Sequence, residues 1–196
     1  MTRARRRCRL FALGLTMIAG ACSSPAPVLY TIAPAEGVAH IAGPRVILLQ
    51  QVGIERYLDR SQIVRSSENY RLDVMANDWW GEPLAAMLDR MLATELAQRF
   101  PHSTVLRETG VVTSSPDATV EVNVQRLDED AAGSVVLHAQ AGVRFKGEKV
   151  SAVQTFRFVV VPPGPGIPGQ VAATSTGLGQ LADGIAALLL ASPGAR

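Results

Sequence analysis

The sequence predicts a single α/β domain in which two main helices pack on a mixed, mostly antiparallel sheet. Two helical segments, at residues 83–99 and within residues 171–190, alternate with groups of short segments of strand composition. The order strands, helix, strands, helix favours one layer of helices on one sheet. We expect this domain to span residues 28–191 and to be followed by a short C-terminal tail, residues 192–196.

Residues 1–21 have the composition of a signal peptide. A basic start with five arginines precedes an apolar run, residues 10–20, that is too short to span a bilayer. The small residues directly before Cys22 resemble a bacterial lipobox, in which the cysteine is acylated and becomes the new N-terminus. We therefore expect Cys22 to be the lipid attachment site and residues 22–27 to be an extended tether. An ordinary signal peptide cut near Ala21 is the alternative.

Removal of this segment would reverse the net charge of the chain. The full sequence has 19 Lys+Arg and 17 Asp+Glu, a formal net charge of +2. Without the five N-terminal arginines, 14 basic residues face 17 acidic ones, which gives a net charge of −3. A nucleic-acid partner is therefore not implied. Only Cys22 would remain of the two cysteines, so no disulfide within the chain is expected.

Several segments have the length and composition of strands. Residues 45–52 are a continuous apolar run, which predicts a strand buried on both faces. Residues 66–69 predict a tight turn between two short strands, 62–65 and 70–75. Residues 119–127 alternate between valine and polar residues and begin an expected antiparallel meander. The other expected strands are 28–32, 104–106, 135–145 and 153–161, and residues 33–44 are expected to be a loop.

The strongest helix signal lies at residues 83–99. Pro83 suits the first helical position because its missing N–H would have no intrahelical partner there, and Pro101 ends the helix. The apolar residues recur at helical spacing and form one stripe: Leu84, Met87, Leu88, Met91, Leu92 and Leu96. Leu88 and Leu92, at its centre, are expected to be fully buried. The polar residues are expected to lie off the stripe: Asp89, Arg90, Glu95 and Gln98.

The second helical segment, within residues 171–190, has an apolar stripe that includes Leu178, Leu181 and Ile185. Three glycines lower its intrinsic helix propensity: Gly177, Gly179 and Gly184. Residues 162–169, rich in proline and glycine, are expected to form a stiff loop before this helix.

Two short motifs flank the start of the first helix. Residues 57–64 read YLDRSQIV, and residues 80–84 read WGEPL and run into the helix. In order and spacing these motifs resemble the PqiC-like (YmbA-like) family, whose members are auxiliary lipoproteins of ABC-type intermembrane lipid transporters. The sequence departs from the family pattern at three positions, where serine, tryptophan and glycine replace the commoner proline, arginine and alanine: Ser61, Trp79 and Gly81.

The resemblance implies an accessory subunit of an MCE-type system, which moves lipids between inner and outer membranes with an ABC permease and ATPase. Ser23 follows the lipidated cysteine where aspartate would favour the inner membrane, so the resemblance implies a lipid-anchored domain at the periplasmic face of the outer membrane. The role implied is docking or stabilising the conduit, not ATP hydrolysis. Formation of a homo-oligomer is left open.

The same motifs supply the candidate site residues. The candidate partner-binding residues are Tyr57, Asp59, Arg60 and Trp79. The motif residues expected to be structural are Trp80, Glu82, Pro83 and Leu84. Asp59 and Arg60 form either a local ion pair that fixes their loop or part of a docking surface. We expect one of the two tryptophans to pack in the core and leave the other open.

No catalytic constellation is evident, so an enzyme is not expected. Residues 164–169 match G-x-G-x-x-G, but prolines there remove the N–H donors that a phosphate site needs. Ser175 lies in a segment resembling a nucleophile elbow, yet all three histidines precede it, whereas the histidine of an elbow follows. A helix start, with Thr174 or Ser175 as its cap, is expected instead. The competing functions are an envelope hydrolase using Ser175 and a structural lipoprotein that binds peptidoglycan or an assembly machine.

No metal or cofactor is expected apart from acyl chains on Cys22. The histidines lack the spacing of zinc ligands: His40, His102 and His138. Residues 128–130 read Asp-Glu-Asp but lack the glycine and distal glutamate of a calcium loop, so a solvated turn is expected.

Overall fold

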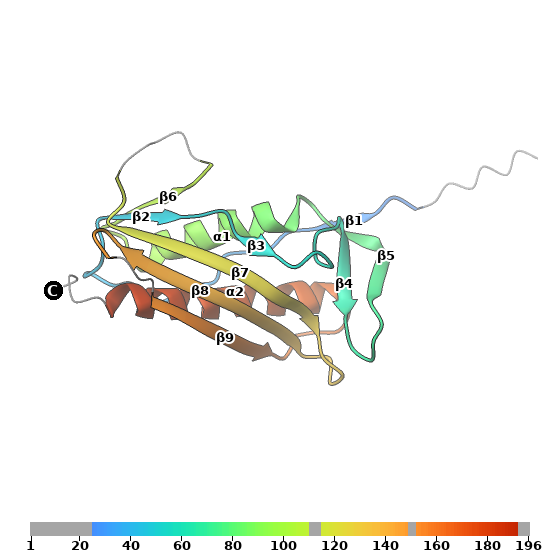
Figure 1. The fold of residues 1–196 in the computed structure, drawn as a ribbon. Coiled ribbons are helices and arrows are strands. Elements are labelled where there is room, and N and C mark those ends of the chain that lie inside the picture. Colours follow the sequence, from blue (N-terminus) through green and yellow to red (C-terminus); the bar gives the residue numbers. More distant parts are fainter. Residues whose placement is uncertain (1–24, 110–114, 149–151, 192–196) are drawn as a thin grey trace, which may run out of the picture.

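The computed structural model describes residues 25–109, 115–148 and 152–191, which form two helices on one face of a nine-stranded sheet (Figure 1). The strands are β1 (Val28–Tyr30), β2 (Val46–Leu49), β3 (Gly53–Ile54), β4 (Gln62–Ser66), β5 (Asp73–Trp80), β6 (Thr104–Arg107), β7 (Ala118–Glu129), β8 (Val135–Phe145) and β9 (Ala152–Val160). The helices are α1 (Leu84–Arg99) and α2 (Gly166–Leu190). The expected α/β class with two main helices is confirmed.

The expected signal peptide, Cys22 and the C-terminal tail lie outside these residues. Neither α1 nor α2 is both long and apolar enough to cross a membrane.

A long antiparallel meander, β7–β8–β9, makes up most of the sheet. β7 and β8 pair along nearly their whole lengths with one irregularity, between Val124 and Arg126, and β8 and β9 pair without any. β2, β3 and β4 follow one another along the other side of β7 and pair with it in parallel. β6 pairs parallel with β2, β1 pairs parallel with β5, and β4 and β5 form an antiparallel hairpin. The sheet is therefore mixed and largely antiparallel, as expected.

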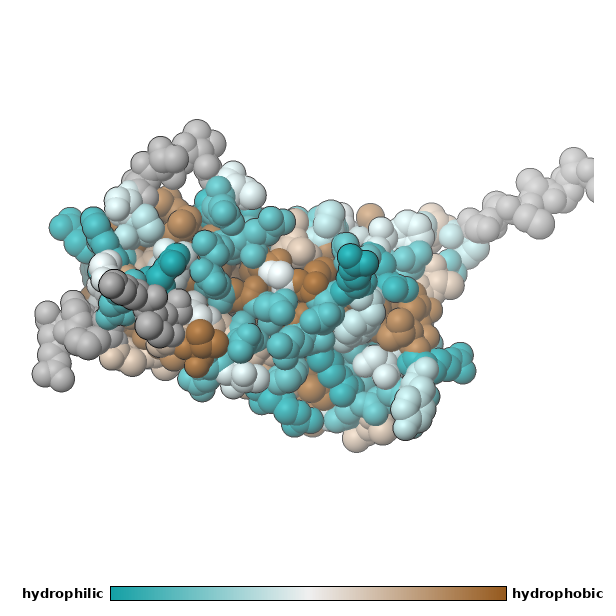
Figure 2. All heavy atoms as spheres, in the orientation of Figure 1, coloured by the Kyte–Doolittle hydropathy of each residue, from teal (hydrophilic) through white to brown (hydrophobic). Residues whose placement is uncertain are grey.

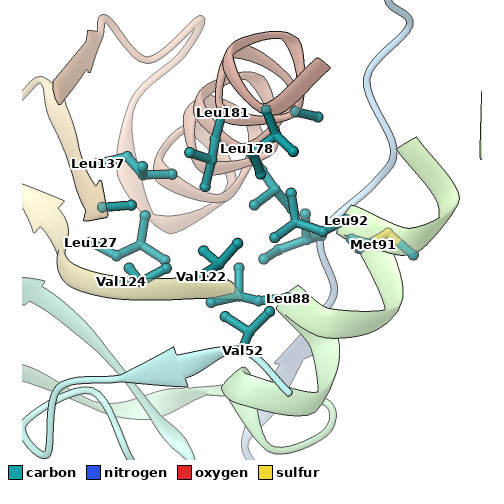
Figure 3. Close-up of a cluster of buried hydrophobic side chains, with 14 of the residues drawn as sticks. Val52, Leu88, Met91, Leu92, Val122, Val124, Leu127, Leu137, Leu178 and Leu181 are labelled. Carbon is teal, nitrogen blue, oxygen red and sulfur yellow. The ribbon is translucent and has the colours of Figure 1, made fainter. Parts of the chain in front are cut away.

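The core lies between the sheet and the two helices. All six stripe residues of α1 are buried, and Leu88 and Leu92 have no exposed surface, as expected. Figure 3 shows them facing Val52, in the connection between β2 and β3, together with Val122 of β7 and Leu178 of α2. The opposite face of the sheet is largely hydrophilic (Figure 2), which fits a sheet that packs on one side only.

Several boundaries differ from the expectation for physical reasons. Only alternate residues of β2 are buried, so residues 45–52 do not form a strand buried on both faces. β5 begins at Asp73 because Asn69 and Tyr70, with φ of 56° and 62°, extend the turn after β4. β5 continues to Trp80, beyond the expected end at residue 75, so both tryptophans belong to it.

Helix α2 begins at Gly166, five residues before the expected segment. Gly166 has a φ of 72°, which lets the chain turn directly after Pro165. Pro168 falls in the first turn, where a missing N–H costs no intrahelical bond. Thr174 and Ser175 are therefore more than a turn inside α2, and the expected capping role is wrong.

The glycines of α2 mark close approaches to other elements. A Cβ atom at Gly179 would lie 2.6 Å from the Cβ atom of Ala35, and one at Gly184 would overlap the ring of Phe156. The low helix propensity of these residues is thus offset by packing that a larger residue would prevent.

Residues 31–45, here called the strap, carry the chain from β1 to β2 across both helices. The backbone N–H of Ala33 donates to Ser175 Oγ at 3.2 Å, and that of Ala35 donates to Glu95 Oε1 at 2.9 Å. The N–H of His40 donates to the carbonyl oxygen of Arg99 at 2.6 Å. The strap is therefore fixed by both helices.

Arg99 is fully buried where the strap, α1 and α2 meet. Its Nε donates to Asp183 Oδ1 at 2.6 Å and its Nη2 to the carbonyl oxygen of Gly179 at 2.9 Å. Its Nη1 donates to the carbonyl oxygen of Glu95 at 3.2 Å. A side chain on Gly37 would overlap the guanidinium. Arginine does not lose its charge by deprotonation, so these hydrogen bonds and the Asp183 carboxylate offset the cost of burying it.

Two acids of α1 are buried, contrary to the expectation that they lie off the apolar stripe. Asp89 is 4% exposed and pairs with Arg107 of β6 at 3.4 Å, and Glu95 has no exposed surface. Burial raises the pKa of Asp89, and Arg107 opposes that shift. Burial raises the pKa of Glu95 to about 7 from an ordinary 4.5, with the N–H of Ala35 and the charge of Arg99 opposing and Asp183 adding to the shift.

Substitution of Glu95 by glutamine should remove part of the pH dependence of folding. A carboxyl whose pKa is raised in the folded state stabilises the fold below pH 4.5, and this contribution is lost as the pH rises to about 7. Glutamine can still accept from Ala35 but does not ionise. Urea denaturation should show Glu95→Gln more stable than the wild type at pH 8, by as much as about 3 kcal/mol, and similar to it at pH 4.5. Parallel pH profiles for the two proteins would contradict this assignment.

Candidate functional site

The first motif forms a compact loop between β3 and β4. Backbone N–H groups of Leu58 and Asp59 donate to the carbonyl oxygens of Glu55 and Arg56 at 2.9 and 3.3 Å. Leu58 is buried and anchors the loop in the core. Arg60 Nε donates to the carbonyl oxygen of Tyr57 at 2.7 Å, so its guanidinium supports its own loop. Asp59 is exposed.

The second motif turns the chain from β5 into α1 directly beside this loop. The N–H of Trp80 donates to the carbonyl oxygen of Ser61 at 2.7 Å, which joins the two motifs. The N–H of Gly81 donates to the carbonyl oxygen of Tyr30 at 2.8 Å, which ties the turn to the end of β1. Glu82 forms an ion pair with Arg90 on α1. The turn is thereby held on three sides.

A surface pocket of about 470 Å³ opens where the two motifs meet, and we call it the signature pocket. Its lining residues are Asp59, Arg60, Ser61, Trp80, Gly81, Glu82 and Pro83. The fold therefore brings together five of the candidate residues from motifs about 20 positions apart. Ser61 and Gly81 line the pocket as well, although the sequence marked them only as departures from the family pattern. Asp59 and Arg60, both described by the structure, do not form an ion pair with each other.

Trp79, Trp80 and Leu84 have different surroundings. Trp80 is 8% exposed and packs in the core, which confirms the expectation for one tryptophan. Trp79 is half-buried on the other face of β5, where its Nε1 donates to the carbonyl oxygen of Ala76 at 3.0 Å. Leu84 is buried at the start of α1. Trp79 is therefore not part of the signature pocket.

Tyr57 joins the first motif to the end of β7. Its hydroxyl donates to Asp128 Oδ2 at 2.9 Å, and Arg126 Nε donates to Asp128 Oδ1 at 2.8 Å. Asp128 has no exposed surface, so the expected solvated turn at 128–130 is wrong for this residue: two donors permit its burial. Burial, followed by the charge of Asp128, raises the pKa of Tyr57 well above its ordinary value. The Tyr57 hydroxyl thus remains a donor.

Ser175 has the surroundings of a structural residue. Its Oγ donates to the carbonyl oxygen of Val171 at 3.0 Å and accepts from the N–H of Ala33 at 3.2 Å. These two bonds use the hydroxyl to join α2 to the strap. Within residues 25–109, 115–148 and 152–191, no group of three or more His, Cys, Asp or Glu side chains is placed to hold a metal ion.

Comparison of the sequence with known protein families identifies the family of this chain. The family model of the "ABC-type transport auxiliary lipoprotein component" matches residues 28–186, most of the chain. The chain belongs to this family. The resemblance of the two motifs to PqiC-like proteins is thereby confirmed. Family membership makes the protein a lipoprotein component associated with an ABC transport system and anchored to a membrane of the cell envelope.

Solved structures of low sequence identity share the fold of this family member. An uncharacterized protein superimposes with a TM-score of 0.69 at 19% identity, over 83% of this chain and 98% of that one. Protein XCC0632 from Xanthomonas campestris, assigned to DUF330, superimposes with a TM-score of 0.66 at 17% identity, over 81% of this chain and 91% of that one. No curated protein matches the sequence. At these identities the structures support the fold alone.

Removal of the Tyr57 hydroxyl should destabilise the domain. Tyr57→Phe leaves a fully buried carboxylate with one donor fewer, which costs about 1–3 kcal/mol. Tyr70→Phe is the matched control, because Tyr70 is fully exposed and should tolerate the change within about 0.5 kcal/mol. Urea denaturation measures both variants. Equal stabilities of the two would show that the Tyr57–Asp128 hydrogen bond contributes nothing to the fold.

Proposed function

We propose that this lipoprotein is a docking or stabilising subunit of an MCE-type ABC system for intermembrane lipid transport, and that the signature pocket contacts a partner protein of that system. The observation that carries the proposal is the convergence of both family motifs on one exposed pocket. Most buried motif residues serve packing, whereas a loop residue that stays exposed favours a role in binding. Asp59 is such a residue.

The chemistry of the signature pocket suits a protein partner. It combines two carboxylates, a guanidinium, a hydroxyl and the small exposed part of a tryptophan, and tryptophan and arginine are enriched in protein interfaces. The loop and the turn are each fixed by backbone hydrogen bonds, so little conformational entropy would be lost on binding. The pocket offers no paired nucleophile and base, which favours binding over catalysis.

The position of the pocket also suits a tethered domain. β1 pairs with the end of β5, with Tyr30 opposite Trp80, so the chain enters the domain beside the pocket. In our proposal Cys22 carries the acyl chains, and Ser23 directs the protein to the periplasmic face of the outer membrane. Six residues of tether reach at most about 20 Å, which would keep the pocket close to that membrane.

Neutralising both charges of the first motif should abolish docking without unfolding the domain. The test variant is Asp59→Ala with Arg60→Ala, and its matched control is Glu55→Ala with Arg56→Ala, an exposed pair in the same loop outside the pocket. Both variants should remain folded. Glu55, Arg56 and Asp59 are exposed and contribute little, whereas the loss of the hydrogen bond from the half-buried Arg60 to the carbonyl oxygen of Tyr57 should lower the stability of the test variant by about 1.5–3 kcal/mol. Co-purification with the MCE-domain protein, permease and ATPase should be lost only in the test variant.

Two results would count against the proposal. Unfolding of the test variant together with loss of co-purification would show that Asp59 and Arg60 support their own loop. Retained co-purification with unchanged stability removes the signature pocket from the docking surface.

The lipid anchor has its own test. Cys22→Ser removes the proposed acylation site, so the protein should become soluble or remain unprocessed, because stable anchoring needs at least two acyl chains. Membrane fractionation compares the variant with the wild type. A processed variant that still fractionates with the outer membrane would show that another feature anchors the protein.

A further inference from the structure

β9 leaves one edge of the sheet open. It pairs with β8 on one side, and within the described ranges no strand pairs with its other side. In a strand between two antiparallel neighbours, successive residues bond to the two neighbours in turn. The N–H of Lys146, just after β8, donates to the carbonyl oxygen of Asp117, just before β7. The even-numbered residues of β8 therefore bond to β7 and the odd-numbered residues bond to β9. Their partners in β9 have even numbers. The odd-numbered residues therefore direct their N–H and C=O groups away from the sheet: Val153, Thr155, Arg157 and Val159.

This edge lacks the features that usually prevent strand addition. Protected edges carry prolines, several charges or a bulge, whereas β9 has no proline, pairs without irregularity and holds one charged residue, Arg157. Val153 and Val159 are 58% and 45% exposed on the solvent face of the strand. A nine-residue strand with free backbone groups is complementary to another extended backbone.

A groove lies beside this edge on the side of the helices. It has a volume of about 720 Å³ and is lined by residues of β9 and α2. These two elements lie side by side (Figure 1). Phe156 and Phe158 of β9 contribute rings whose centroids lie 6.0 Å apart. The Phe156 ring packs closely against Gly184 of α2, and Phe158 is the more exposed of the two rings. Asp183 adds a half-exposed carboxylate, one oxygen of which is bonded to Arg99. An open strand beside such a groove can bind both the backbone and alternate side chains of a peptide.

We propose that β9 and the β9–α2 groove bind an extended segment of a partner protein by strand addition. The segment carries β-branched apolar residues at alternate positions, which pack against the phenylalanine rings on the helix side of the edge. A basic side chain faces Asp183. A second copy of this chain fits less well, because antiparallel pairing of two β9 strands places both α2 helices, each with its Asp183 carboxylate, on the same side of the junction. The proposal does not depend on the signature pocket.

Peptide binding to the mature protein tests the backbone part of the proposal. The probe is a fluorescein-labelled nonapeptide in which valine alternates with threonine, with a lysine at its centre. Two further peptides carry N-methyl groups on the odd-numbered or on the even-numbered residues. Fluorescence anisotropy should show that one methylated peptide binds like the parent and the other binds at least about tenfold more weakly, because only one set of N–H groups faces β9. Replacing the central lysine by glutamate should weaken binding.

Variants of β9 give the matching test on the protein. Thr155→Pro removes one outward N–H and no bond to β8, so it should weaken binding by about tenfold while Thr155→Ala binds like the wild type. Equal binding of both methylated peptides, or no binding of the parent peptide, overturns the proposal. Because the peptide experiment uses the wild-type protein, it still decides the question if Thr155→Pro unfolds. Concentration-dependent dimerisation that Thr155→Pro abolishes would overturn it too, because a second copy would then occupy the edge.

Discussion

The buried guanidinium of Arg99 holds the two helices and the strap together. The guanidinium donates to a side chain and a backbone carbonyl of α2 and to a backbone carbonyl of α1. The backbone carbonyl of Arg99 accepts from the strap. A buried charge is tolerated only when it is paired and hydrogen-bonded. Asp183, Gly179 and Gly37 must consequently keep their present positions around Arg99, so one side chain restricts the relative placement of three elements far apart in the sequence.

The placement of α1 in turn determines the signature pocket. The apolar stripe seats α1 on the sheet, and the turn before it is bonded to β1 and to the loop of the first motif. Glu82 and Arg90 add an ion pair between the turn and the helix. Tyr57 extends the same connection to the buried Asp128 of β7. The family motifs thus combine residues that hold the local structure with the few that face solvent.

The sequence pattern predicted the elements that depend on hydrophobic periodicity, namely the fold class, α1 and the meander. It failed for Asp89, Glu95 and Asp128, because periodicity treats an acid as exposed and cannot show a partner such as Arg107 or Tyr57 from another element. The sequence pattern also placed the start of α2 too late. The prolines and glycines near residue 166 indicated a loop, and the sequence did not show that Pro168 lies in the first turn of a helix, where proline is tolerated. The pocket depended on a tertiary contact, Trp80 to Ser61, that no local pattern contains.

The strap has a further consequence for how the chain folds. The hydrogen bond between Ala33 and Ser175 joins residues 142 positions apart, and the one between Arg99 and Asp183 joins residues 84 positions apart. The β7–β8–β9 meander, in contrast, forms between neighbours in the sequence. The N-terminal part of the domain can complete its contacts only when α2 is present, because Ser175 and Asp183 belong to that helix. The long separations also make these contacts slow to form. The strap and α1 therefore lack these contacts until α2 is present.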